Sequence, residues 1–184
     1  MTAISTQSAG EVLSNGGVIA YPTEAVWGLG CDPQNEEAVH RILTIKQREV
    51  SKGLILVAAN QEQISPLISS LTEEQRKLLN ESWPGPVTWL LPDPDNVIPS
   101  WIKGEHASVA IRVSAHPIVV ALCQAFEGPI VSTSANQAGE PEIRSRLIIE
   151  EQFSDKIDAV VEGELGSSLQ PSEIRDITSG AQLR

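Results

Sequence analysis

Three cationic residues fall within seven positions of the chain, at Lys46, Arg48 and Lys52. Positive charge gathered in one short segment of an acidic chain suits anion binding, because a guanidinium forks two phosphate oxygens and an ammonium acts as a point charge. A triphosphate is an anion of this kind. The structural alternative is a helix end, since the dipole of the helix expected before this segment favours one or two cations there. Glu49, inside the cluster, leaves both interpretations open.

A run of hydroxyl and carboxamide side chains follows an apolar segment that begins at Pro129. The run contains Ser132, Ser134 and Asn136 at alternate positions. Side chains of this kind at the carboxyl end of a strand are what a ligand crevice in an open α/β sheet requires. The alternative is that they cap a turn by bonding to nearby backbone groups.

The segment Tyr21–Gly30 has the pattern of a strand that runs into a turn rich in proline and glycine. The Thr23 hydroxyl and exposed backbone amides can face a ligand there, and Gly28 and Gly30 permit its close approach. The spacing matches neither a dinucleotide-binding glycine motif nor a P-loop, so neither nucleotide fold follows from it. A tight turn with a packed Trp27 is the structural alternative.

Polar groups also interrupt two segments that otherwise have the pattern of strands. Arg112 lies in the apolar run Ser108–Val113, where an arginine must reach solvent, a carboxylate or a phosphate. A structural salt bridge accounts for it equally well. Late in the chain, Ser172 and Arg175 can close over a ligand as part of a terminal lid.

Groups so far apart in the sequence must be brought together by the fold. Short apolar runs alternate with longer segments of helical periodicity, and this alternation predicts an α/β domain. Asn35 is suited to cap one helix, and Thr72 with Gln75 has the capping-box spacing. We expect strands at Gly17–Tyr21, Leu54–Ala58, Val87–Leu91, Ser108–Val113, Pro129–Thr133, Ile157–Val161 and Ser172–Ile177. We expect helices at Thr6–Ser14, Glu36–Gln47, Thr72–Glu81, Pro117–Phe126 and Ser145–Phe153.

Composition narrows the class of protein. A chain of 184 residues can fold as one domain with an adequate core. No apolar run approaches the roughly 20 residues needed to cross a bilayer, so we expect no membrane contact. The N-terminus lacks the basic and then apolar pattern of a secretory signal, and we therefore expect a cytoplasmic protein.

The cysteines, the histidines and the net charge further limit the kinds of site that we expect. Cys31 and Cys123 are expected to be buried, reduced thiols, because no CxxC pair or zinc-type histidine spacing accompanies them. We expect no metal site built by protein side chains and no catalytic histidine. The net charge of −11 and a pI near 4.7 argue against a surface that binds nucleic acid by itself. Any RNA contact is expected to be local or transient.

Six segments, in their order along the chain, resemble the YrdC/TsaC family of threonylcarbamoyl-AMP synthases. They are AYPTEAVWGLGCD, KQREVSKGLILVA, WPGPVTWLLP, SVAIRV followed by HP, IVSTSAN and PSEIRD. The resemblance spans roughly Gly17 to Asp176. It implies a single YrdC-like α/β domain over residues 1–184, in the short form without a separate C-terminal domain. Its architecture would be a twisted, mostly mixed open sheet flanked by helices, with a large basic cavity.

The resemblance also implies residue roles. Lys46 and Arg48 match the KxR element of the family and would be catalytic, while Thr23 and Arg112 would hold threonine and the carbamate. The residues implied to bind ATP or the adenylate are Lys46, Arg48, Lys52, Ser132, Ser134, Asn136, Ser172 and Arg175.

The implied reaction joins L-threonine, bicarbonate or CO2, and ATP with Mg2+ to give L-threonylcarbamoyladenylate, diphosphate and water. The product supplies the threonylcarbamoyl group for a modified adenosine in tRNA. We therefore expect transient hand-over to the complex that transfers the group, with at most a weak tRNA contact. Two other classes remain as alternatives: an RNA-binding or ribosome-maturation factor, and a nucleotide-binding regulator without catalysis.

Overall fold

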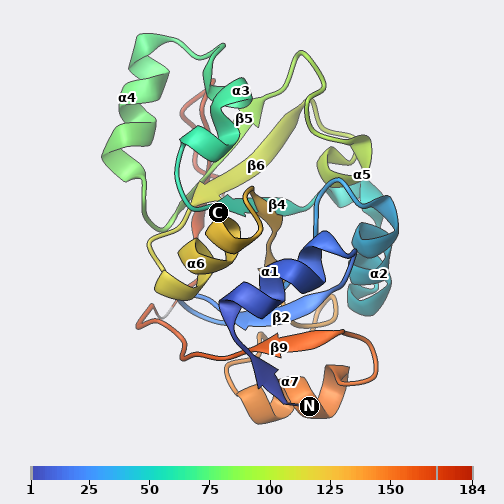
Figure 1. The fold of residues 1–184 in the computed structure, drawn as a ribbon. Helices are drawn as coiled ribbons and strands as arrows, with labels where there is room; N and C mark the ends of the chain where they lie inside the picture. Colours follow the sequence, from blue (N-terminus) through green and yellow to red (C-terminus); the bar gives the residue numbers. More distant parts are fainter. Residues whose placement is uncertain (1, 169, 184) are drawn as a thin grey trace.

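The computed structural model describes residues 2–168 and 170–183 and arranges them in two five-stranded sheets (Figure 1). Both sheets mix parallel and antiparallel neighbours; β2, for example, is parallel to β9 and antiparallel to β3. The first sheet has the order β1 (Ala3–Ile4), β9 (Ala159–Val161), β2 (Ile19–Pro22), β3 (Trp27–Gly30) and β8 (Thr133–Ser134). The second has the order β10 (Glu173–Asp176), β5 (Val87–Pro92), β6 (Ser108–Val113), β4 (Ile55–Ala58) and β7 (Ile130–Val131).

Two helices begin at the side-chain caps that the sequence predicts. The Asn35 side chain accepts from the backbone N–H of Ala38 at the start of α2, and Thr72 forms a capping box with Gln75 at the start of α4. Both contacts confirm the predicted caps. The helices are α1 (Thr6–Ser14), α2 (Glu36–Lys46), α3 (Ser65–Ile68), α4 (Glu73–Ser82), α5 (Ser100–Lys103), α6 (Pro117–Ala125) and α7 (Arg146–Phe153), with 3-10 turns at Val50–Lys52 and Glu62–Ile64.

One short stretch of chain crosses from the second sheet to the first. β7 pairs with β4, and two residues later β8 pairs with β3. Between them the Ser132 N–H donates to the carbonyl of Ile55 at 2.8 Å, and beyond them the Ala135 N–H donates to the carbonyl of Trp27 at 2.8 Å. The crossing therefore fixes the hydroxyl-rich run where the two sheets meet.

Helices α1 and α6 pack together across β2, β4 and β9 and bury a second apolar cluster beside the main core (Figure 1). The cluster includes Leu13 of α1 and Leu122 of α6, both fully buried. Gly10 allows the two helices to approach, because a Cβ there would lie 2.8 Å from the Cβ of Ala125. Both cysteines are free and buried, Cys31 in the main core and Cys123 in this cluster, as expected.

The structure confirms the α/β class and corrects the predicted elements in three places. The stretch Trp27–Gly30 is a strand rather than part of a turn; its two glycines, which are uncommon inside strands, had indicated a turn. The expected strand Pro129–Thr133 is two short strands in different sheets. The two-residue β1 and the four-residue α3 and α5 were not predicted, because periodicity needs a longer segment.

Within residues 2–168 and 170–183, no helix has both the length and the apolar character needed to cross a membrane.

Candidate active site

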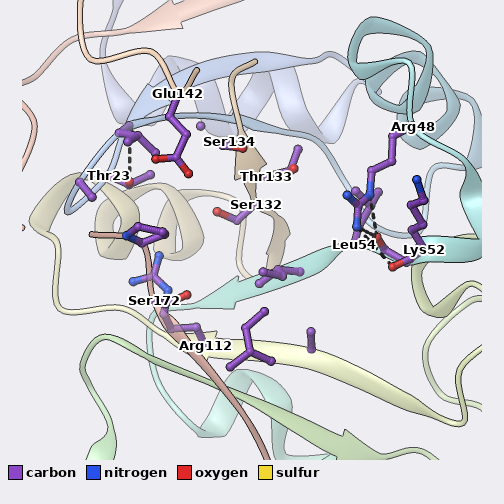
Figure 2. Close-up of a pocket in the computed structure, with 18 of the residues that line it drawn as sticks. Thr23, Arg48, Lys52, Leu54, Arg112, Ser132, Thr133, Ser134, Glu142 and Ser172 are labelled. Carbon is purple, nitrogen blue, oxygen red and sulfur yellow. Dashed lines mark hydrogen bonds between the residues drawn. The ribbon is translucent and has the colours of Figure 1, made fainter. Parts of the chain in front are cut away.

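A cavity of about 590 Å³ lies between the two sheets and the C-terminal segment. In Figure 2, Arg48 and Lys52 line one side, Thr23 and Glu142 line the other, and Ser132 lies between. Nine of the ten residues expected from the sequence line it: Thr23, Lys46, Arg48, Lys52, Arg112, Ser132, Ser134, Asn136 and Ser172.

Arg175 is not among the residues that line the cavity. It lies on β10, where successive side chains point to opposite faces, and its neighbour Ile174 lines the cavity. The Arg175 guanidinium instead pairs with the carboxylate of Glu173, with Nη2 2.6 Å from Oε2. Ser172 is held at the cavity wall by a 2.8 Å hydrogen bond with the hydroxyl of Thr88.

Lys46, a residue only 4% exposed, organises the loop after β8 through its ammonium group. Its Nζ donates to the carbonyl oxygens of Ser134 at 2.5 Å and Asn136 at 2.8 Å, and lies 3.4 Å from Asn136 Oδ1. The Ser134 hydroxyl donates to the same Oδ1 at 2.5 Å. The lysine and the two polar residues therefore form one unit in which Lys46 supplies positive charge and fixes the backbone.

Burial of this ammonium has an electrostatic consequence. Desolvation and, to a smaller extent, the nearby Arg48 guanidinium lower the pKa of Lys46, the Glu142 carboxylate opposes both, and together they bring it to about 8. Lys46 is therefore a cation near neutral pH that can lose its proton in mildly alkaline solution.

Arg48 holds the 3-10 turn that follows α2. Its Nε and Nη2 donate to the carbonyl of Gly53 at 3.1 and 3.0 Å, and Nη2 also reaches the carbonyl of Lys52 at 3.3 Å. The turn places Arg48 and Lys52 together at the cavity edge, as Figure 2 shows. Partial burial lowers the pKa of Arg48 without removing its charge at neutral pH.

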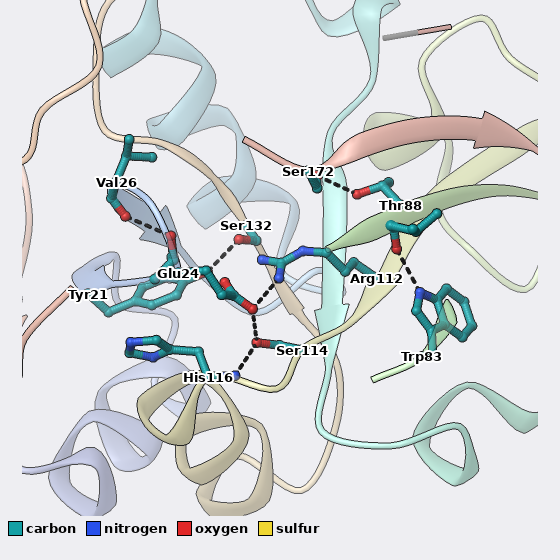
Figure 3. Close-up of polar contacts among 12 residues, drawn as sticks. Tyr21, Glu24, Val26, Trp83, Thr88, Arg112, Ser114, His116, Ser132 and Ser172 are labelled. Atoms are coloured by element: carbon teal, nitrogen blue, oxygen red, sulfur yellow. Dashed lines mark hydrogen bonds and ion pairs between the residues drawn. The ribbon is translucent and has the colours of Figure 1, made fainter. Parts of the chain in front are cut away.

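Thr23 and Ser132 are each oriented by a neighbouring group. The Thr23 hydroxyl donates to the carbonyl of Val26 at 2.7 Å and closes the turn between β2 and β3. The Tyr21 hydroxyl, fully buried, donates to Ser132 Oγ at 2.7 Å (Figure 3). Burial raises the pKa of Tyr21, so its proton remains available for this bond at neutral pH.

A second polar network at the cavity centres on Glu24, which was not predicted as a site residue. One carboxylate oxygen, Oε1, accepts from Nη1 of Arg112 and from the hydroxyl of Ser114, the latter at 2.6 Å (Figure 3). Ser114 Oγ in turn accepts from the backbone N–H of His116 at 3.0 Å. Burial opposes ionisation of Glu24, but Arg112 and Ser114 outweigh it and lower the pKa of this carboxyl.

Positive charge predominates on the cavity wall of this acidic chain. Lysine or arginine lines it at positions 46, 48, 52, 103 and 112, against carboxylates at Glu24 and Glu142. Lys103 is tied by its Nζ to Asp93 at 2.9 Å and is largely buried. Sequence reasoning missed both glutamates and Lys103. Glu24 was adjacent to the predicted Thr23, but no local pattern showed that it would meet Arg112, 88 positions away.

Comparisons with known proteins agree with this architecture. The Sua5/YciO/YrdC family model, described as telomere recombination, matches residues 11–184. A threonylcarbamoyl-AMP synthase of Pseudomonas aeruginosa is 52% identical over 178 residues, covering 97% of this chain and 95% of the relative. A structure of a P. abyssi Sua5 variant superposes with a TM-score of 0.90 at 35% identity, covering 97% of this chain and 55% of that protein.

A second P. abyssi Sua5 structure, in complex with L-threonine, has a TM-score of 0.87 and 34% identity over 96% of this chain and 52% of that protein. This chain thus spans about half the length of Sua5 but nearly all of its curated bacterial relative. The family model covers well over half of the chain and the identity to the curated relative is high. The chain therefore belongs to the Sua5/YciO/YrdC family.

Proposed function

We propose that this protein forms L-threonylcarbamoyl-AMP from L-threonine, bicarbonate and ATP, with release of diphosphate and water. The observation that carries the proposal is the cavity: it gathers five cationic side chains and the polar run Ser132–Asn136 in a chain of net charge −11. Such a wall fits a triphosphate and a carboxylate together. The curated relatives named threonylcarbamoyl-AMP synthase support the same activity.

The reaction has two bond-forming stages. The threonine ammonium first loses one proton, and the neutral amine then attacks CO2 derived from bicarbonate. An N–C bond forms, one C=O π bond of CO2 opens to give the carboxylate, and the nitrogen loses a second proton to leave N-carboxy-threonine with one N–H. A carbamate oxygen then attacks the α-phosphorus of ATP, and the bond from that phosphorus to the bridging oxygen breaks to release diphosphate. This second stage requires positioning and charge stabilisation rather than a protein nucleophile.

The residues divide between the two substrates. Arg48 and Lys52, together at the cavity edge, would bind the phosphates, since both present cationic donors there. Lys46 would act on the same anion through its charge and by fixing the loop of Ser134 and Asn136, because its N–H groups already bond to that loop. Ser132 and Ser172 would add neutral donors to ATP or the adenylate.

The amino acid would lie near Thr23 and Arg112, the pair implied to hold threonine and the carbamate. Arg112 is the cavity cation on β6, and Thr23 lies in the turn that also carries Glu24. The Thr23 hydroxyl is engaged with Val26, so it can offer an oxygen lone pair to the substrate while its proton remains in the turn.

Mg2+ would accompany ATP on its phosphate oxygens and neutralise part of the triphosphate charge. The cavity fits an ion held mainly by the nucleotide. Its carboxylates, Glu24 and Glu142, are not joined by a further acidic, cysteine or histidine side chain into a metal-binding group in the described ranges.

We further propose that the protein works in the cytoplasm and passes its labile product to the enzymes that modify tRNA. Its acidic character favours a brief protein-to-protein hand-over and leaves at most a weak, local tRNA contact.

Diphosphate release from Mg-ATP by the purified protein tests the proposal, with threonine and bicarbonate each present or omitted. Release that needs both substrates is the expected result. ATP binding without release would indicate a nucleotide-binding regulator. Strong, salt-sensitive binding of tRNA or ribosomal RNA without release would indicate an RNA-associated role. Either of these outcomes would replace the proposal.

A further inference from the structure

Glu24 and Arg112 form an ion pair at the cavity wall, and each partner has polar atoms that the pair does not use. Glu24 uses only Oε1 for Arg112 and Ser114, and Arg112 uses only Nη1 for Glu24. In the described part of the chain, the one fully buried side-chain N or O atom without a hydrogen-bond partner is His116 Nδ1. Glu24 Oε2 and the Nε and Nη2 groups of Arg112 are therefore not sealed by protein. Because both residues line the cavity, these groups are open to a ligand there.

An open carboxylate oxygen beside open guanidinium N–H groups has a definite chemical preference. The guanidinium donates to a carboxylate, and the carboxylate accepts from an amino group, so the pair matches a molecule that carries both groups on neighbouring atoms. A ligand with a carboxylate alone would meet Arg112 already neutralised and would lie against the charge of Glu24. The pair therefore favours an α-amino acid over the same acid without its amine.

We propose that Glu24, paired with Arg112, is a specificity-determining residue that selects for the amino group of the α-amino acid in the subsite assigned above to threonine. The inference rests on the proposed function, in which the amino acid is threonine. Glu24 accepts from the amino group through Oε2 and leaves the remaining N–H groups of Arg112 to the substrate carboxylate. Its interaction with nitrogen persists after carboxylation, because the carbamate retains an N–H.

The local structure holds this carboxylate in place independently of the ion pair. The carbonyls of Thr23 and Glu24 accept from the backbone N–H groups of Gly166 at 2.9 Å and Ser168 at 3.0 Å. At Gly166 a Cβ would lie 2.7 Å from the carbonyl oxygen of Glu24, so the two segments are in direct contact. A change confined to the Glu24 carboxylate therefore leaves the turn anchored, and a Glu24→Gln variant is expected to fold.

Equilibrium binding without ATP turnover tests the proposal. The probes are L-threonine and 3-hydroxybutyrate, which has the same carbon chain and hydroxyl but no amine. Glu24→Gln should weaken threonine binding by ~10- to 100-fold, as expected for loss of a charge-assisted hydrogen bond, while 3-hydroxybutyrate binding is unchanged or tighter. Glu24→Asp should recover part of the preference. A matched control, Glu173→Gln, removes a Glu–Arg pair that does not line the cavity and should change neither constant.

A loss of affinity for threonine that exceeds any loss for 3-hydroxybutyrate supports the role of Glu24, because a merely structural effect would weaken both together. Equal weakening of both ligands, an unchanged ratio of the two constants, or a greater loss for 3-hydroxybutyrate overturns it. The affinity for Mg-ATP, measured on the same variants, should stay within about threefold of the parent, as binding at the other side of the cavity predicts. If the parent chain binds glycine or L-serine in place of threonine, the proposed function fails and the subsite stands. If it binds no α-amino acid, the subsite is overturned.

Discussion

Raising the pH should weaken ATP binding through the loss of one proton from Lys46. This side chain is 4% exposed, and burial with the adjacent Arg48 lowers its pKa to about 8. With this pKa, roughly 90% of the molecules carry a protonated Lys46 at about pH 7, and roughly 10% do so at about pH 9. If the triphosphate requires the charged form, the dissociation constant for Mg-ATP should rise about tenfold per pH unit above this pKa.

The assay is equilibrium titration of the protein with Mg-ATP from about pH 7 to about pH 9.5, without threonine or bicarbonate. Omitting them removes the ionisation of the substrate amine from the measurement. A Lys46→Arg variant is the matched comparison, because a guanidinium keeps its charge throughout this range. It should bind more weakly at neutral pH, since its geometry cannot reproduce the three contacts of Nζ, but its affinity should be nearly independent of pH.

An identical alkaline loss of affinity in the parent and in Lys46→Arg would refute this reasoning, because the titrating group would then lie elsewhere. Circular dichroism across the same pH range checks that the fold is intact, so that loss of affinity cannot be ascribed to unfolding.

Two further substitutions test how the cavity is supported. Tyr21→Phe removes the buried hydroxyl that donates to Ser132 Oγ at 2.7 Å. The free energy of unfolding, measured in urea, should fall by about 0.5–1.5 kcal/mol, and the KM for ATP should rise. Unchanged values of both would contradict a positioning role for Tyr21. Asp93→Ala leaves the buried Lys103 ammonium without its carboxylate and should cost about 3–5 kcal/mol in the same assay. Adding Lys103→Met should restore part of that stability, and a further loss in the double variant would contradict the explanation.

Local chemistry was enough to predict most of the helices and several strands. The helix Thr6–Ser14 and the strand Ser108–Val113 have the predicted bounds, and the caps at Asn35 and Thr72 form as expected. These elements depend on periodicity and on contacts between residues close in sequence, which a single sequence displays directly. The strand Trp27–Gly30 escaped because its identity comes from pairing with β2 and β8, not from its own composition.

Contacts between distant segments also explain why the sequence predicted only part of the cavity. Residue types identified Lys46, Arg48 and the run after Pro129 as polar groups in need of partners, and the resemblance indicated that they share a ligand. No local sequence pattern indicated that the chain changes sheets at Ser132. Nor did one indicate that the Lys46 ammonium would donate its hydrogen bonds to the loop of Asn136. Such contacts join residues about 90 positions apart, so they are properties of the assembled fold.

The most direct test of the proposed activity follows the carbon of bicarbonate into the product. The purified protein is incubated with Mg-ATP, L-threonine and isotopically labelled bicarbonate, and the nucleotides are separated promptly and analysed by mass spectrometry. We predict an adenylate that carries both threonine and the labelled carbon, formed in equal amount to diphosphate and absent when threonine is omitted. Diphosphate formed without a labelled threonine adenylate, or no new nucleotide at all, would contradict the account.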